Sequence, residues 1–385
     1  MEKIKVMSIF GTRPEAIKMA PLIKELERCE EIESKVCVTA QHREMLDQVL
    51  EHFNITADFD LNVMKEKQSL SGVTNRILIG MEEIFNQYTP DLILVHGDTT
   101  TTFSSSLAAF YKQIQVGHVE AGLRSFDKHF PYPEEINRKL TGVLADMHFA
   151  PTANSKENLL REGVKEEDIF VTGNTVIDAM NFTVQDNYKF KCEELNLIDF
   201  NKKIIMVTAH RRENWGSGIR NICNAIKEIV GRNENVEVIY SVHLNPVVKD
   251  MVKEVLGETE RVHLLPPLDA SDAHNLMNKC FMVMTDSGGL QEEAPHLGKP
   301  VIVLRDVTER PEAVKAGTVK LVGTNYDKII KETEDVLNNQ QVYNKMKSAI
   351  NPYGDGKASK RIVESILYKF NKCCEKPEEF KGEEF

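Results

Sequence analysis

The sequence predicts an α/β protein with two doubly wound domains, and three observations support this fold class. Short apolar runs alternate with longer segments of helical period, which is the pattern of a parallel sheet covered by helices. This series of runs restarts after a polar stretch at residues 185–201. The chain also has 385 residues, whereas one domain usually has ~100–200 residues. Two domains, each with a full core, are therefore expected.

The apolar runs of the first half are expected to form strands, and the periodic segments between them helices. The expected strands are Ile4–Phe10, Lys35–Thr39, Leu92–His96, Val116–Glu120 and His148–Ala150. The expected helices are Met19–Arg28, Arg43–Phe53, Leu70–Tyr88, Phe103–Tyr111, Glu135–Ala145 and Lys156–Arg161. In open parallel sheets, ligands bind beyond the carboxyl ends of the strands. Residues that directly follow a strand are therefore the first candidates for a functional site.

The second half repeats this pattern, and the limits of the domains follow from the restart. Its expected strands are Ile204–Ala209, Val236–Val242, Val262–Leu264, Phe281–Thr285, Val301–Leu304 and Lys320–Val322. We place the first domain at residues 1–174 and the second at 175–356, with a helix at 357–370 that packs back on the first domain. Residues 371–385 are polar and charged, which predicts a flexible tail.

The composition excludes several classes of protein. Hydrophobic residues at 41% and charged residues at 28% are ordinary for a globular protein, which argues against a disordered or fibrous chain. A net charge of −11 argues against a nucleic-acid surface, so an anionic ligand needs local positive groups. No stretch approaches the ~20 apolar residues of a membrane span, and the first residues carry no targeting leader. A soluble cytoplasmic protein without a membrane or nucleic-acid partner is expected.

A turn that follows the first expected strand is the first candidate for phosphate binding. Gly11 permits a tight turn, and Pro14 suits the first turn of a helix. Arg13 between them would lie beside free backbone N–H groups, which together can hold a phosphate. A purely structural turn is the commoner explanation of such a segment. The absence of a GxGxxG motif argues against a dinucleotide site.

Three carboxylates of the first half lie at strand ends or at the next helix start. Asp98 follows the strand Leu92–His96, Glu120 ends the next strand, and Glu134 begins a helix. Carboxylates in such positions can abstract or donate protons. Each also has a structural alternative, with Asp98 as a helix cap and Glu134 as the i,i+4 partner of Arg138. Their convergence from successive strand ends favours catalysis.

The second half offers positive and small residues at its strand ends. The segment His210-Arg211-Arg212 follows a buried strand and is typical of an anion pocket, and its spacing matches no metal motif. The segment Asp286-Ser287-Gly288-Gly289 follows another strand, and its small residues would let a phosphate approach backbone amides, although a tight turn is the alternative. Glu293, one turn further, offers a carboxylate to ribose hydroxyl groups.

Taken together, these segments resemble the non-hydrolysing UDP-N-acetylglucosamine 2-epimerases. The likeness covers nearly the whole chain and rests on the joint order of the segments, since any one of them alone is weak. The segments are Phe10–Lys18, Thr39–Leu46, His96–Thr102, Gly117–Arg124, Pro133–Arg138, Ala209–Asn214, Val242–Pro246, Thr285–Glu293, Thr308–Glu312 and Asn351–Gly356.

The resemblance implies a glycosyltransferase-B-like fold of two Rossmann-like domains, an active site in the cleft between them, and a homodimer. It implies no cofactor and no metal. The implied reaction is reversible epimerisation at carbon 2 of UDP-N-acetylglucosamine (UDP-GlcNAc) to UDP-N-acetylmannosamine (UDP-ManNAc). The implied route eliminates UDP to form 2-acetamidoglucal and adds it back, and the product supplies ManNAc units for cell-surface polysaccharide. The expected ligands are UDP-GlcNAc, UDP-ManNAc and UDP.

The resemblance also implies roles for residues that match the motifs of the family. The catalytic set comprises Asp98, Glu120, Glu134 and His210, of which His210 also contacts the diphosphate. The substrate contacts are Arg13, Lys18, Arg138, Ser287, Gly288, Gly289, Glu293 and Arg310. A second, regulatory UDP-GlcNAc site of many bacterial relatives matches Gln41, His42, Glu44, Lys67, Arg211 and His243, which could alternatively form only a helix cap and surface ion pairs. Ala273 replaces a phenylalanine of many nucleotide pockets, which predicts looser packing of the base.

Three other functions share part of this pattern. A hydrolysing epimerase would release free ManNAc, and a glycosyltransferase of the same architecture would pass the sugar to an acceptor. A nucleotide-sugar sensor would keep the anion pocket and lose the carboxylates. The presence of all three acids favours an epimerase, because a transferase usually needs one base.

Overall fold

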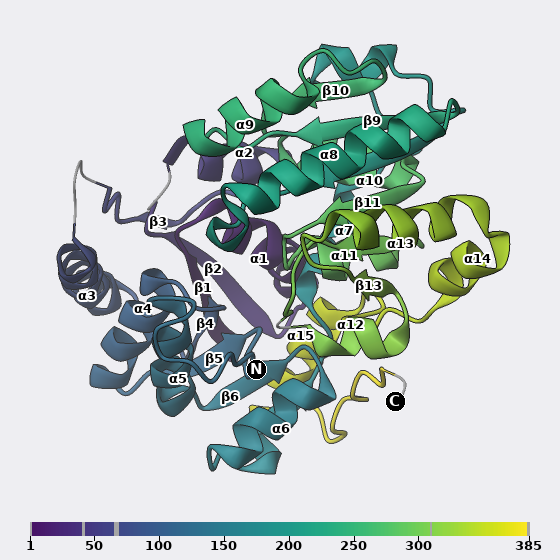
Figure 1. Cartoon of the computed structure of the whole chain (residues 1–385). Coiled ribbons are helices and arrows are strands. Elements are labelled where there is room, and N and C mark those ends of the chain that lie inside the picture. Colours follow the sequence, from purple (N-terminus) through teal and green to yellow (C-terminus); the bar gives the residue numbers. More distant parts are fainter. Residues whose placement is uncertain (1, 41–42, 65–68, 309, 383–385) are drawn as a thin grey trace. The chain divides into compact units, whose positions relative to one another are not determined.

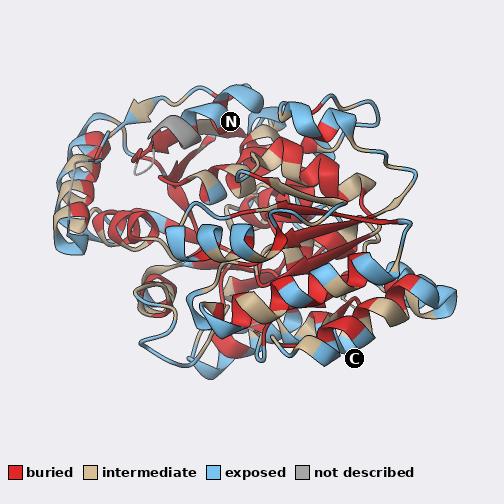
Figure 2. Cartoon of the chain, turned by 45° about the horizontal axis from the view of Figure 1, so that its top comes forward, coloured by how far each residue is buried: buried red, intermediate tan, exposed pale blue. Residues whose placement is uncertain are grey.

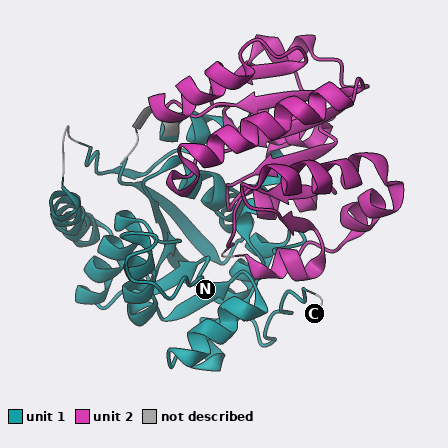
Figure 3. Ribbon diagram, viewed as in Figure 1, with its two compact units in different colours: residues 1–182, 353–382 teal, residues 183–352, 383–385 magenta. Residues whose placement is uncertain are grey.

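The computed structural model describes residues 2–40, 43–64, 69–308 and 310–382, and residues 43–45 by their backbone only. The chain forms two compact units. Unit 1 comprises Met1–Phe182 and Tyr353–Gly382, and unit 2 comprises Thr183–Pro352 (Figure 3). The chain therefore returns to unit 1 after it has completed unit 2.

The described part of unit 1 is built on a seven-stranded parallel sheet with the order β3-β2-β1-β4-β5-β6-β7. The strands are β1 (Ile4–Phe10), β2 (Ile32–Val38), β3 (Phe59–Asp60), β4 (Leu92–His96), β5 (Gln115–Val119), β6 (Met147–Ala150) and β7 (Ile169–Val171). The helices are α1 (Arg13–Arg28), α2 (Arg43–His52), α3 (Leu70–Gln87), α4 (Thr100–Tyr111), α5 (Glu134–Leu144), α6 (Ala153–Arg161), α7 (Thr175–Thr183) and α15 (Ala358–Lys369) (Figure 1).

Both faces of this sheet are covered, which explains why its strands are continuous apolar runs. Side chains alternate between the faces of a strand. Val6 and Phe10 of β1 belong to one core cluster, whereas Met7 and Ile9 belong to another on the opposite face. Figure 2 shows strands buried along their length and helices with an exposed outer surface.

The described part of unit 2 contains a six-stranded parallel sheet with the order β10-β9-β8-β11-β12-β13. The strands are β8 (Lys203–Thr208), β9 (Val236–Ser241), β10 (Val262–Leu265), β11 (Met282–Thr285), β12 (Val301–Val303) and β13 (Val319–Leu321). The helices are α8 (Ser217–Arg232), α9 (Pro246–Leu256), α10 (Ala270–Lys279), α11 (Leu290–His296), α12 (Pro311–Ala316), α13 (Tyr326–Asn338) and α14 (Gln340–Ser348).

The strand order reverses in the middle of each sheet, between β1 and β4 in unit 1 and between β8 and β11 in unit 2. In doubly wound sheets this switch point is the place where the loops leave room for a ligand. The predicted α/β fold class with two parallel sheets is confirmed. The short strands β3 and β7 escaped prediction because two or three residues carry too little pattern.

The limits of the units differ from those that the sequence suggested. Helix α7 lies beyond the proposed limit at 174, yet Ala179 belongs to the core of unit 1, and the division falls after Phe182. Helix α15 packs against α1 of unit 1. Phe380 lies in the expected flexible tail, but it is buried and its N–H donates to the carbonyl of Val171. The apolar Phe380 side chain explains why this part of the tail is held.

No helix within the described ranges is both long enough and apolar enough to cross a membrane.

Candidate active site

The turn between β1 and α1 is shaped by a buried carboxylate. Glu15 Oε2 accepts hydrogen bonds from the backbone N–H groups of Gly11, at 3.1 Å, and Thr12, at 2.8 Å. This arrangement is a capping box, and it starts α1 at Arg13, earlier than predicted. A Cβ atom at Gly11 would collide with the hydroxyl of Thr39, so only glycine fits here. The turn places Arg13 at the helix N-terminus.

The second oxygen of Glu15 reaches the turn that follows β4. The Thr99 hydroxyl donates to Glu15 Oε1 at 2.7 Å, and it accepts from the N–H of Thr102 at the start of α4. Burial raises the pKa of Glu15, and the hydrogen bonds oppose this rise. Glu15 was absent from the predicted site, although the spacing of Thr12 and Glu15 is a capping-box signal that could have identified it.

Asp98 lies directly beyond β4 and is bound to helix α5. Its Oδ2 atom is 2.6 Å from Arg138 Nη2, and its carbonyl accepts from Asn137 Nδ2 at 2.9 Å. Thr99, and not Asp98, caps α4. The alternative role of Asp98 as the cap of this helix is therefore wrong. Its carboxylate, which is partly exposed, does not cap α4.

Glu120 lies at the corresponding position beyond β5. Its φ angle of 62° is in the left-handed region, which is unfavourable for a residue with a side chain and is typical of functional sites. Its carboxylate forms an ion pair with Lys18 and accepts from Asn174 Nδ2 at 2.8 Å. Burial raises the pKa of Glu120, but the charge of Lys18 and the hydrogen bonds from Lys18 and Asn174 act together with the other nearby charge to outweigh it, so the pKa is lowered overall. Glu120 is therefore ionised at neutral pH.

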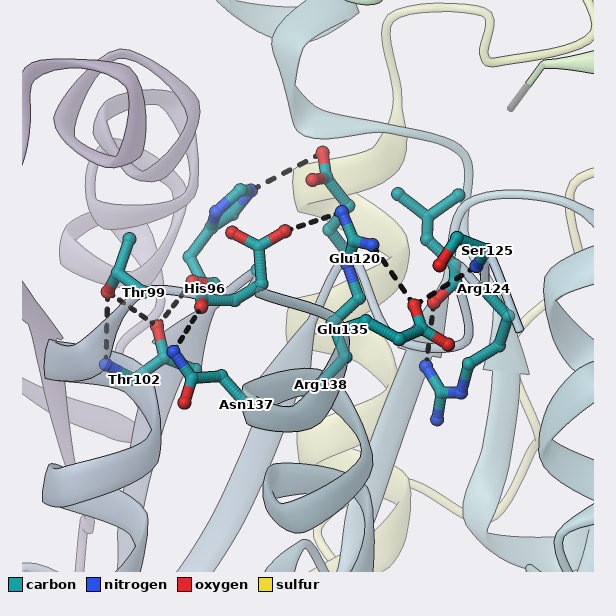
Figure 4. A network of polar contacts seen from close by, with 12 residues as sticks. His96, Thr99, Thr102, Glu120, Arg124, Ser125, Glu135, Asn137 and Arg138 are labelled. Carbon is teal, nitrogen blue, oxygen red and sulfur yellow. Dashed lines mark hydrogen bonds and ion pairs between the residues drawn. The ribbon is translucent and has the colours of Figure 1, made fainter. Parts of the chain in front are cut away.

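His96, the last residue of β4, faces Glu120 (Figure 4). Its Nε2 atom is 3.7 Å from Glu120 Oε2. Burial lowers the pKa of His96 to about 4, so the imidazole is neutral at pH 7. This histidine was not in the predicted site, because it was counted only as the end of an apolar strand.

Glu134 and Glu135 begin helix α5 with different environments. Glu135 is fully buried and accepts from the backbone N–H groups of Ser125, at 3.0 Å, and Phe126, at 3.1 Å. Glu134 Oε2 is buried and has no hydrogen-bond partner among the described residues. Arg138 pairs with Asp98 and, at 3.4 Å, with Glu135 (Figure 4), so the proposed i,i+4 pair with Glu134 is wrong.

In unit 2, buried Asp286 connects the turns that follow β8 and β11. Its Oδ2 atom accepts from the backbone N–H groups of His210 and Arg211, both at 2.8 Å, and from Asn214 Nδ2 at 3.0 Å. Its Oδ1 atom lies 3.6 Å from His210 Nδ1. Burial lowers the pKa of His210, and the charge of Asp286 opposes this. The sequence placed Asp286 in a turn but did not show this role.

The segment Ser287-Gly288-Gly289 lies beside Arg310 and Glu293. A Cβ atom at Gly288 would be 2.5 Å from Arg310 Nη1, and one at Gly289 would be 3.1 Å from Glu293 Oε1. Buried Glu292 holds Arg310, whose Nε donates to Glu292 Oε1 at 2.6 Å. The structure thus brings the predicted small residues, the predicted carboxylate and the predicted guanidinium together. Glu292, which orients the guanidinium, was missed.

Comparison with known proteins identifies the family. A family model described as UDP-N-acetylglucosamine 2-epimerase matches residues 24–367. The chain belongs to this family. Since epimerases are isomerases, the predicted enzyme class and the predicted resemblance are both confirmed.

Relatives of the family match the chain along its length. A UDP-N-acetylglucosamine 2-epimerase from Bacillus subtilis is 56% identical over 99% of this chain and 100% of its own. A solved relative from Listeria monocytogenes has a TM-score of 0.93 at 53% identity and covers 99% of this chain and 100% of its own. The Neisseria meningitidis epimerase, solved with UDP-GlcNAc bound, has a TM-score of 0.86 at 50% identity and covers 94% of this chain and 100% of its own.

Other residues predicted for the epimerase site are placed only in part. The rings of His210 and His243 stack with centroids 5.1 Å apart and planes inclined by 9°. Gln41, His42 and Lys67 lie outside the described residues, and Glu44 is described only by its backbone in α2.

Ala273, at the position expected to lie beside the base, precedes a histidine that contacts the predicted carboxylate. The Nε2 atom of this histidine, His274, lies 3.4 Å from Glu293 Oε2.

Among the described residues, no group of three or more His, Cys, Asp and Glu side chains could hold a metal ion.

Proposed function

We propose that the chain catalyses the reversible epimerisation of UDP-GlcNAc at carbon 2, with UDP-ManNAc as the product. The observation that carries this proposal is the set of carboxylates at the ends of β4 and β5, where Asp98 lies beside Arg138 and Glu120 is ionised beside Lys18. Inversion at carbon 2 needs one group that removes a proton from one face and another that returns a proton to the other. Two or more carboxylates satisfy this need.

The proposed route is an elimination followed by an addition. A carboxylate takes the proton from carbon 2, the bond between carbon 1 and the phosphate oxygen breaks, and UDP and 2-acetamidoglucal result. The phosphate oxygen of UDP then attacks carbon 1 again, while a carboxylic acid delivers a proton to the opposite face of carbon 2. Ionised Glu120 is in the form that accepts a proton. The roles of Asp98 and Glu134 as its counterparts follow the motifs of the family.

The departing diphosphate needs positive charge and hydrogen-bond donors. His210, the Ser287 hydroxyl, the amides of Gly288 and Gly289, and Arg310 offer these groups in unit 2, and Arg13 offers a guanidinium in unit 1. The net charge of −11 makes such local groups necessary for an anionic substrate. We therefore assign the carboxylates of unit 1 and the anion-binding groups of unit 2 to one reaction on UDP-GlcNAc, the ligand bound to the Neisseria meningitidis relative.

A proton NMR time course with UDP-GlcNAc in deuterated water tests this proposal. We expect signals of UDP-ManNAc and loss of the carbon-2 proton signal as solvent deuterium enters both sugars. Free ManNAc with UDP would instead identify a hydrolysing enzyme, and binding without conversion would identify a sensor. Conversion with full retention of the original proton would exclude the elimination route.

We also propose regulation by UDP-GlcNAc at a second site that includes Arg211 and His243. Two contacts support the coupling of this site to His210: the ring of His243 stacks on it, and Asp286 holds the amides of His210 and Arg211 together. An effector that changes one site must alter affinity or rate at the other. Freshly purified UDP-ManNAc alone should react after a lag that a trace of UDP-GlcNAc shortens. An immediate linear start, unaffected by UDP-GlcNAc, would exclude the second site.

We propose that the chain works as a homodimer. We also propose that it acts in the cytoplasm and that its product supplies ManNAc units for cell-surface polysaccharide. Large apolar side chains that are exposed on neighbouring helices support an interface: Phe110 (58% exposed) and Tyr111 (68%) on α4, and Val143 (84%) on α5. Sedimentation should give a dimer that Val143→Glu weakens. A monomeric native chain would contradict this assignment.

A further inference from the structure

An unusual feature of unit 1 is the imidazole of His96, which is buried against a carboxylate without a hydrogen bond. The side chains of His96 and Glu120 are 4% and 9% exposed, and His96 Nε2 is 3.7 Å from Glu120 Oε2. Within the described residues, His96 Nε2 has no hydrogen-bond partner. Buried polar atoms without partners are costly and are rare in folded proteins. This nitrogen therefore needs an explanation.

The other hydrogen-bond partners described for Glu120 act as donors to it. Lys18 Nζ and Asn174 Nδ2 both donate to Glu120 Oε2. The Asn174 oxygen is already the acceptor for the N–H of Val176 at 3.2 Å. A lysine ammonium and an amide NH₂ have no lone pair to offer. Once Glu120 is protonated, neither the Lys18 ammonium nor the Asn174 NH₂ group can accept a hydrogen bond from its O–H group.

His96 is the neighbour that can change its role. A neutral imidazole nitrogen donates or accepts a hydrogen bond according to the tautomer. Burial lowers the pKa of His96 to about 4, so the ring remains neutral beside Glu120. A separation of 3.7 Å is too long for a hydrogen bond, but contacts between catalytic groups often shorten once the substrate is bound.

We propose that His96 is a positioning residue that donates to Glu120 when the carboxyl group is ionised and accepts from it when the carboxyl group is protonated. This inference rests on the proposed acid–base role of Glu120. His96 stabilises the protonated form of Glu120 between the two half-reactions, while another acid delivers a proton to the opposite face of carbon 2. The imidazole itself carries no net charge in either state.

Two other ionisable groups lie around His96, and each already has a partner. Lys18 from α1 is engaged with Glu120. His118 of β5 is occupied through Nε2, which lies 2.7 Å from the carbonyl oxygen of Gly97. Burial also lowers the pKa of His118 to about 3, so it remains neutral. The pair of His96 and Glu120 is therefore expected to act without a second imidazole.

Two substitutions of His96 separate this role from packing. A glutamine side chain extends its amide to about the position of Nε2 and carries a donor and an acceptor, whereas an asparagine side chain is too short to reach Glu120. We expect His96→Asn to lower kcat by ~10-fold or more, with KM changed little, and His96→Gln to restore most of the loss. The primary isotope effect with carbon-2-deuterated UDP-GlcNAc should increase in His96→Asn, because proton transfer then limits the rate.

His148→Asn is the matched control. His148 is also a buried histidine, and burial lowers its pKa to about 4, but it lies on β6 and no contact joins it to Glu120 among the described residues. We expect this variant to lose thermal stability and to keep the isotope effect of the parent. A His96→Asn variant that keeps kcat within ~2-fold of the parent, or that loses activity with an unchanged isotope effect, would overturn the proposal.

A readout without turnover separates this inference from the proposed function. In protein labelled with ¹⁵N-histidine, long-range ¹H–¹⁵N NMR reports the tautomer of His96. We expect Glu120→Gln to change the Nε2 shift of His96, and Glu134→Gln to leave it unchanged. No response to Glu120→Gln refutes the pairing of His96 with Glu120. If the parent chain does not convert UDP-GlcNAc at all, the proposed function fails even where this NMR response is observed.

Discussion

The two units share the same central strand order in their parallel sheets but differ in the chemistry at the strand ends. In both, the strand order reverses between the first strand and the fourth, at β1 and β4 in unit 1 and at β8 and β11 in unit 2. Beyond these strands, unit 1 has the carboxylate of Asp98, and unit 2 has the imidazole of His210 and the small residues at 287–289. The shared fold therefore fixes where a site can form, and the residues beyond the strands decide its charge.

Both units also hold the turns at their switch point with a buried carboxylate. In unit 1 this is Glu15, which comes from the helix after the first strand. In unit 2 it is Asp286, which directly follows the fourth strand. A carboxylate accepts several N–H groups at once, so it can join two turns that would otherwise bury unpaired donors. The comparison teaches that these buried acids hold the turns of the site, while a partly exposed acid such as Asp98 remains available for chemistry.

The largest difference expected between the units is in their response to acid. Burial lowers the pKa of three histidines of unit 1, namely His96 to about 4, His118 to about 3 and His148 to about 4. An unfolded chain binds protons at these positions below pH ~6.5, whereas the folded unit does not. The stability of unit 1 should therefore be fully present above this pH and fall by up to ~1.4 kcal/mol per pH unit for each histidine as the pH decreases toward 4.

Trp215 allows this difference to be measured, because it is the only tryptophan of the chain and lies in unit 2. On acid titration, far-UV circular dichroism should change at a higher pH than Trp215 fluorescence. His148→Gln should make the first transition less steep. Coincident transitions, or a native transition unaffected by His148→Gln, would show that the buried histidines do not distinguish the units.

The contribution of one carboxylate of unit 1 can be tested by replacing a single carboxylate oxygen with an amide NH₂ group. Asp98→Asn keeps the size of the side chain and leaves Thr99 as the cap of α4. We expect turnover to fall ~10²-fold or more, which is the usual contribution of a general acid or base. Circular dichroism should confirm that the variant is folded. Near-normal turnover would reduce Asp98 to an ion-pair partner of Arg138.

The sequence predicted the strands well because each is an apolar run bounded by turn residues. It also predicted the candidate residues that lie beyond the strands, such as Asp98 and Glu120, because strand ends can be read from the pattern. It did not show the roles of Glu15, Glu135 and Asp286, because a charged residue in a turn or at the start of a helix looks solvated until the folded chain supplies its N–H donors. The orientation of His96 toward Glu120 depends on the register of β4 and β5, which no local pattern gives.

A smaller effect should distinguish the two switch-point carboxylates. Glu15→Gln and Asp286→Asn each place an NH₂ group against N–H donors, so each should lower the free energy of unfolding by ~2 kcal/mol. Trp215 Nε1 donates to the carbonyl of His210 at 3.0 Å. Asp286→Asn should therefore shift Trp215 emission in the folded protein, and Glu15→Gln should not. Equal emission in both variants would argue that Asp286 does not hold the turn at His210.

The smallest expected effect is on the binding of the UDP diphosphate in unit 2. His210→Ala removes an imidazole beside the turn that Asp286 holds. We expect a ~10-fold loss of UDP affinity together with slower turnover. The reason is that the proposed diphosphate contact is made in both the ground state and the transition state. His263→Ala is the control, since this histidine of unit 2 is paired with Glu237 and belongs to neither proposed nucleotide site. Titration calorimetry with UDP measures both. If His210→Ala binds UDP as the parent does, anion binding in unit 2 depends on Arg310 and the segment 287–289, and His210 serves another step.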